Sequence, residues 1–259
     1  MSLTENTQLT NALNYNVSNM VFSKPIVSSI AGSAQMTYKR IMIGTKNPDG
    51  TQGDLVLNTE RLFSFGIGTR NPEGDVKDGY QLTLSMHNRD NPSPNELSWI
   101  RTFNAIIDKC KDHLLQTKDQ LGLYELSKED SLLKNCNPLK YKKDKGKVVE
   151  GVPPILGVKL IERKGEIISM FHDDRGNTVD PLSLFKKHCH VTAAIKVESI
   201  FIGSKLIAIQ IKLYEAQVRL VDTGLKRLLP RPEPVDQPEE PVTICSEDSS
   251  PFDDDDIPN

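Results

Sequence analysis

Two long segments with strand-like patterns, residues 190–202 and 206–220, constrain the fold most, because together they predict one long β-hairpin. Only Gly203-Ser204-Lys205 separates the two segments. A three-residue loop there pairs odd positions with odd positions, so that residues such as Val197 and Ile211 share one apolar face. We therefore expect a fold in which β-structure dominates.

Six further segments also have strand-like patterns. They cover residues 36–43, 54–57, 62–67, 80–87, 155–163 and 166–171. Two copies of one turn chemistry, Asn47-Pro48-Asp49-Gly50 and Asn71-Pro72-Glu73-Gly74, lie among the first of them. In each copy proline presets φ and glycine accepts a positive φ, which favours a tight turn.

One long amphipathic helix is predicted after Ser93-Pro94, with its end near Gly122. Its apolar stripe consists of Leu97, Ile100, Phe103, Ile107, Cys110 and Leu114. Trp99 lies beside this stripe, so we expect its ring to pack. About eight strands with one inserted helix favour a closed or nearly closed antiparallel barrel, an elaborated oligonucleotide-binding (OB) fold, over a β-sandwich.

Charge is distributed unevenly along the chain. Residues 231–259 hold one basic and ten acidic residues, which is −9. The whole chain has 32 basic and 35 acidic residues, so residues 1–230 keep 31 and 25, which is +6. Seven of the 16 prolines also follow residue 229. We expect a disordered acidic tail at 230–259, a basic globular domain at 31–229 and a loosely ordered arm at 1–30.

Basic residues with aromatic neighbours suggest that the partner is a nucleic acid. The densest cluster holds five lysines and a tyrosine within residues 140–147. Lysines neutralise phosphates, and aromatic rings stack on bases. The same segment also fits an ordinary solvated loop. The candidate binding residues are Tyr38, Lys39, Arg40, Lys46, Arg70, Arg89, Lys140, Tyr141, Lys142, Lys143, Lys145, Lys147, Lys196 and Lys212.

Catalytic and metal signatures are weak. Gly66-Ile67-Gly68 lacks the third glycine of a dinucleotide fingerprint. His188-Cys189-His190 lacks a second Cys/His pair at zinc-finger spacing, and strand alternation turns Cys189 away from both histidines. We expect no catalytic residues, no metal and no cofactor.

The sequence also gives an expectation about the location of the protein in the cell. The four cysteines are scattered without paired spacing, which fits a reducing compartment. No apolar run is long enough for a membrane span, and no basic residue precedes Lys24 as a secretory signal would require. We expect an intracellular protein that makes no membrane contact.

The segment Phe252-Asp253-Asp254-Asp255-Asp256-Ile257-Pro258 resembles the C-terminal tip of bacterial single-stranded-DNA-binding proteins. In those proteins, an acidic run followed by Ile-Pro-Phe recruits replication and repair partners. Here Asn259 takes the place of the final aromatic residue, although Phe252 offers another anchor. The resemblance implies a partner-binding tail that also competes with DNA for the basic surface.

Several blocks of the body resemble a family encoded by nucleocytoplasmic large DNA viruses. These blocks are Tyr38-Lys39-Arg40-Ile41, residues 44–50, Phe103-Asn104, Lys109-Cys110-Lys111, Asn137-Pro138-Leu139 and residues 194–203. Members of that family look like single-stranded-DNA-binding proteins with an OB fold, distantly similar to those of short-tailed phages. The resemblance implies a role in viral DNA replication, recombination or repair, in the host cytoplasm or nucleus.

Two other functions remain open at this point. One is a β-rich adaptor whose tail binds a replication or transcription protein. The other is a virion structural protein with a basic interior face. A homo-oligomer is compatible with all three functions.

Overall fold

The computed structural model describes residues 3–30, 33–70 and 79–221. The predicted acidic tail and the second predicted turn, at 71–74, lie outside the described residues. The helices are α1 (Pro94–Gln116), α2 (Lys118–Leu121) and α3 (Ser131–Lys134), with short 3₁₀ helices η1 (Leu3–Asn6), η2 (Ala12–Asn14), η3 (Val17–Asn19) and η5 (Pro181–Leu184).

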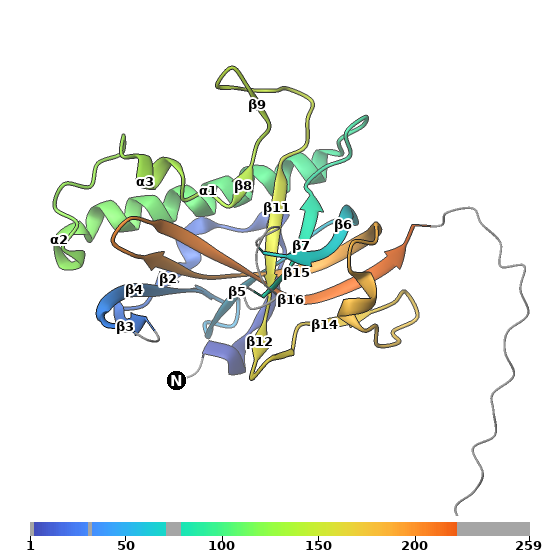
Figure 1. The fold of residues 1–259 in the computed structure, drawn as a ribbon, viewed down its shortest axis with the longest axis horizontal. Coiled ribbons are helices and arrows are strands. Elements are labelled where there is room, and N and C mark those ends of the chain that lie inside the picture. Colours follow the sequence, from blue (N-terminus) through green and yellow to red (C-terminus); the bar gives the residue numbers. More distant parts are fainter. Residues whose placement is uncertain (1–2, 31–32, 71–78, 222–259) are drawn as a thin grey trace, which may run out of the picture. The chain divides into compact units, whose positions relative to one another are not determined.

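The strands make the described part of the chain mainly β, as predicted (Figure 1). They are β1 (Gln8–Thr10), β2 (Met20–Phe22), β3 (Ile26–Ile30), β4 (Ser33–Lys46), β5 (Gln52–Asn58), β6 (Leu62–Thr69), β7 (Tyr80–Ser85), β8 (Leu139–Lys140), β9 (Lys143–Asp144), β10 (Lys147–Val148), β11 (Ile155–Leu160), β12 (Glu162–Arg163), β13 (Glu166–Ile167), β14 (Met170–His172), β15 (Cys189–Ile202) and β16 (Ile207–Leu220).

Five of these strands pair in a closed circuit. β6 pairs with β7, β7 with β11, β11 with β16, β16 with β15, and β15 returns to β6. The β11–β16 pairing is parallel, whereas an antiparallel barrel was predicted, and it joins only two pairs of residues. Beyond the β6 contact, β15 pairs with β5 and then with β4, so this one strand links the circuit to the N-terminal strands.

The long hairpin agrees with the predicted register in its middle only. Ile195 lies opposite Leu213, and Val197 lies opposite Ile211, as predicted. Near the loop, Phe201 lies opposite Ala208, because the connection has four residues, 203–206, rather than three. A bulge between Val197 and Ser199 absorbs the extra residue.

Helix α1 supplies much of the core. The side chain of Ser93 accepts a hydrogen bond from the Glu96 N–H, and the Glu96 carboxylate accepts one from the Ser93 N–H. The two bonds form a capping box. The predicted stripe is buried except for Leu97, which is 41% exposed. Trp99 is buried as expected. Its indole stacks on Phe103 at 4.9 Å, and its Nε1 donates to the Asn58 carbonyl.

The N-terminal residues are more ordered than the loosely attached arm that was expected. β1 pairs with β5, and β2 and β3 pair with β4. Ala12 and Met20 are buried in the core, and the Ala12 N–H donates to Asn58 Oδ1. The Asn-rich composition suggested weak attachment, but the Asn11 and Asn16 side chains cap short helices, and Gln8 Nε2 donates to the Asp49 carboxylate.

Candidate nucleic-acid interface

Two adjoining cavities form one basic groove across β4, β15, β16, β11 and β7. Their volumes are about 600 Å³ and about 510 Å³, and both are lined by Arg70, Lys159, Ala208 and Gln210. We call the combined surface the basic groove. Its cationic side chains are Arg40, Arg70, Lys140, Lys159 and Lys212.

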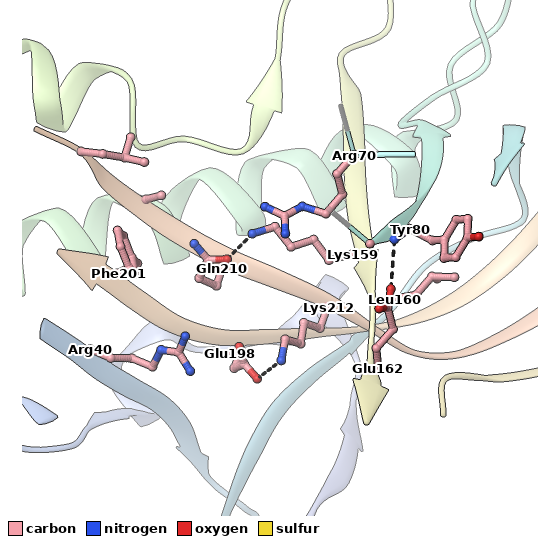
Figure 2. Close-up of a pocket in the computed structure, with 13 residues that line it drawn as sticks. Arg40, Arg70, Tyr80, Lys159, Leu160, Glu162, Glu198, Phe201, Gln210 and Lys212 are labelled. Carbon is pink, nitrogen blue, oxygen red and sulfur yellow. Dashed lines mark hydrogen bonds and ion pairs between the residues drawn. The ribbon is translucent and has the colours of Figure 1, made fainter. Parts of the chain in front are cut away.

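The strand arrangement creates this groove. β11 and β16 pair only at Lys159–Lys212 and Leu160–Leu213, so the two strands diverge beyond these residues. Gly157 on β11 lets the Gln81 side chain lie close to the backbone of this strand, since a Cβ there would lie 2.8 Å from Gln81 Oε1. Figure 2 shows Arg70 and Lys159 on the same side of the cavity, directed toward the Gln210 side chain.

Positive charge in the groove exceeds the negative charge available to balance it. Lys212 forms an ion pair with Glu198 at 2.7 Å, and Glu162 accepts a hydrogen bond from the Tyr80 N–H at 3.0 Å. Within residues 3–30, 33–70 and 79–221, no carboxylate lies within ion-pair distance of the remaining cations, Arg40, Arg70, Lys140 and Lys159. These four cations leave the groove ready to accept an anion.

Partial burial lowers the pKa of the Lys159 ammonium, and the nearby charges of Arg70, Lys212 and Arg40 add to this effect while Glu198 opposes it. The resulting pKa of Lys159 is about 8. Its Nζ donates to Gln210 Oε1, a neutral acceptor that supplies no negative charge. An anion in the groove would therefore stabilise the protonated form.

Aromatic rings lie beside the cations at the β4–β15 edge. The Tyr38 and Phe201 rings are 5.1 Å apart, and the Arg40 guanidinium lies 5.8 Å from the Tyr38 ring centroid. Arg40 and Phe201 are partners in the β4–β15 ladder, so they project from the same face. The Nε of Arg40 is buried and has no hydrogen-bond partner among the described residues.

Some predicted binding residues belong to this groove, and others serve elsewhere. Arg40, Arg70, Lys140 and Lys212 line it, and Tyr38 adjoins it through Phe201. The rest of the predicted residues lie outside the two cavities: Lys39, Lys46, Arg89, Tyr141, Lys142, Lys143, Lys145, Lys147 and Lys196.

Three of these outlying residues have structural contacts instead. Lys39 Nζ donates to the Leu121 carbonyl at 2.5 Å, at the end of α2. Lys196 forms a buried ion pair with Asp54 at 2.6 Å. The Tyr141 hydroxyl accepts a hydrogen bond from Asn104 Nδ2 at 3.0 Å, which holds the ring against the body.

The other outlying residues are exposed. Lys46 borders a separate cavity against the N-terminal segment, and Arg89 lies in the loop before α1. The lysines between 142 and 147 lie on the β9–β10 hairpin, which follows the groove residue Lys140 and projects beyond β8 and α1 (Figure 1).

Lys159, Phe201 and Gln210 were missed by the sequence reasoning. In β11, buried and half-buried residues alternate, and Lys159 occupies an outward position between the buried Val158 and Leu160. The sequence signal that could have identified Lys159 was a single lysine within an apolar strand. Phe201 was assigned to the apolar face because the loop was taken to be one residue shorter.

No helix among the described residues is long and apolar enough to cross a membrane. No group of three or more His, Cys, Asp or Glu side chains in those segments is placed to share a metal ion.

Comparison with known proteins relates this chain to viral relatives. It is 29% identical over 187 residues to "Uncharacterized protein 007R" of Invertebrate iridescent virus 3, covering 70% of this chain and 38% of that protein. It is 30% identical over 204 residues to the "Early 31 kDa protein" of Frog virus 3, covering 76% of this chain and 74% of that protein. The chain thus spans well under half the length of the first relative.

A family model matches residues 14–257, which include most of the described body. The relatives come from iridoviruses, so the expected origin in nucleocytoplasmic large DNA viruses fits at the level of the family. The chain belongs to the family described as "Protein of unknown function (DUF2738)".

Proposed function

We propose that this protein binds single-stranded DNA in the basic groove, without strong sequence preference. One observation carries the proposal: three cations without carboxylate partners lie on the same surface as the Tyr38–Phe201 ring pair. These cations are Arg40, Arg70 and Lys159. Cations that neutralise phosphates and rings that stack on bases are the two components of sequence-tolerant single-strand binding.

The position of the groove on the fold supports the same proposal. OB folds bind oligonucleotides on the face of their second and third strands and at the loops after the first and fourth. In the five-strand circuit, β7 and β11 are second and third in chain order, and they contribute Tyr80 and Lys159 to the groove. The loop after the fourth strand contributes Leu206. We therefore assign the circuit to the OB class.

The proposed role is in viral DNA replication, recombination or repair, within the infected cell. In this proposal the acidic segment 231–259 recruits partner proteins and competes with DNA for positive charge, because its −9 opposes the +6 of residues 1–230. The chemistry proposed is binding alone, so no reaction step is assigned to any residue.

Binding to oligo-dT tests the proposal directly. We expect single strands to bind more tightly than duplex, with log affinity falling against log salt at a slope of about −3.5, as five neutralised phosphates would give. Fluorescence anisotropy across a salt series, with duplex and RNA competitors, measures both quantities. Equal affinity for duplex, or no binding at low salt, would refute the proposal.

The affinity should also depend on pH through Lys159. A bound phosphate favours the ammonium form and so raises its pKa from about 8 toward the ordinary lysine value. Between pH 7 and pH 9, the protonated fraction in the free protein falls from about nine tenths to about one tenth. We expect an affinity loss of about 10-fold over this range. The Lys159→Arg variant keeps its charge and should lack this loss, whereas identical pH profiles would contradict the assignment.

A further inference from the structure

Aromatic and imidazole rings form a row along the outer face of β6. Phe65 is 44% exposed, Phe185 is 37% exposed, and His188 and His190 are also exposed. Phe63 lies 5.2 Å from Phe65, 5.3 Å from His188 and 6.1 Å from His190, measured between ring centroids. We call these five residues together with Tyr80 the aromatic row.

Strand alternation explains why the rings face outward together. In β6, Leu62 and Ser64 are buried, so Phe63 and Phe65 project from the opposite face. His190 lies opposite Phe63 in the β6–β15 pairing, and the adjacent Cys189 points inward and is fully buried.

The backbone beside β6 is shaped to hold part of this row. Gly66 has φ +82°, and a Cβ there would lie 2.3 Å from the Lys187 carbonyl oxygen, so only glycine permits the close approach of residues 184–187. The Lys186 N–H donates to the Ile67 carbonyl at 2.8 Å. Lys186 itself adopts φ 53°, and its ammonium lies 5.4 Å from the Phe185 ring centroid.

The aromatic row continues from the basic groove. Tyr80 lines the groove, and its ring lies 6.5 Å from that of Phe185. Figure 2 shows the Tyr80 ring directed away from the side of the cavity where Lys159 meets Gln210. Successive outward positions on a strand lie about 6.6 Å apart, a spacing that lets an extended strand place separate bases on separate rings.

We propose that the aromatic row is a second contact surface for the same DNA strand, on which bases leaving the basic groove stack against Phe185 and Phe65. The exposed Lys186 and Lys187 provide positive charge for the accompanying phosphates. This inference rests on the proposed function. The continuity with the groove and the flanking lysines favour a nucleic acid over a protein partner, and unstacked bases are available only in a single strand.

The test compares two lengths of oligo-dT in the full chain. One of about 5 nucleotides fills the groove alone, and one of about 20 reaches the aromatic row. The Phe65→Ala/Phe185→Ala variant is expected to bind the long oligonucleotide about 10-fold or more weakly. Its affinity for the short one should stay within about twofold of the parent, as expected for independent sites.

Matched variants separate stacking from other effects. Tyr124→Ala removes a ring that is 70% exposed outside the row and should change neither affinity. The Phe65→Tyr/Phe185→Tyr variant keeps both stacking faces and should bind like the parent.

Three outcomes would overturn the inference. If the parent binds neither oligonucleotide, the proposed function fails and this inference fails with it. If the parent binds both and the double alanine variant loses no long-oligonucleotide affinity, the aromatic row alone is refuted. If the parent self-associates and the double alanine variant does not, while the two bind DNA with equal affinity, the row is an interface between copies of the chain.

Discussion

The Arg70→Glu/Lys159→Glu variant is expected to bind oligo-dT at least about 100-fold more weakly than the parent chain. Each substitution removes a charged donor from the part of the groove common to both cavities. A hydrogen bond to a charged group contributes about 1.5–3 kcal/mol, so the loss of two gives about 3–6 kcal/mol before the repulsion of the new carboxylates is counted. Equilibrium anisotropy at fixed salt measures the change.

Fold stability should not account for this loss. Neither side chain has a carboxylate partner in the described segments, so the substitutions leave no ion-pair partner behind. The Lys24→Glu/Lys128→Glu variant changes the net charge by the same −4 at exposed positions outside the groove. It should bind nearly like the parent at moderate salt. Equal losses from both variants would show that net charge, rather than the groove, governs binding.

Secondary structure could be predicted well because it depends on local patterns. The apolar alternation in 190–202 and 206–220 identified β15 and β16, and Ser93-Pro94 marked the start of α1. The apolar pattern could not determine the pairing register near the loop, which depends on the loop length and on bulges. One extra loop residue moved Phe201 from the apolar face into the groove, and the bulge at Glu198 restored the predicted register of Val197.

The candidate site was harder to predict because charge alone does not reveal a side chain's partner. Lys39 and Arg40 are adjacent in sequence, yet strand alternation sends one to the Leu121 carbonyl and the other into the groove. Lys196 lies 142 residues from Asp54, so no local pattern connects them. Lys159 is a single lysine in an apolar strand. Its place in a cluster of cations depends on Arg70 and Lys212, which the fold brings near it.

The buried pair of Lys196 with Asp54 should contribute to stability and leave DNA binding unaffected. The Asp54 side chain is only 3% exposed and the Lys196 side chain 14%, and their charged atoms lie 2.6 Å apart. The Lys196→Ala variant leaves the Asp54 carboxylate buried, with the Thr7 hydroxyl at 3.2 Å as a neutral donor. We expect it to lower the free energy of unfolding by about 3–5 kcal/mol, a large part of the 5–15 kcal/mol typical of a domain.

Urea denaturation of Lys196→Ala against the exposed Lys46→Ala measures this effect, since both variants lose one lysine charge and only the first leaves a buried carboxylate. The Asp54→Leu/Lys196→Met variant should recover most of the stability, because replacing both charges leaves neither one unpaired. Folded Lys196→Ala should bind oligo-dT like the parent at a temperature well below its unfolding transition. A variant with unchanged stability and weakened DNA binding would instead return Lys196 to the binding surface, and the buried pair would then carry no structural role.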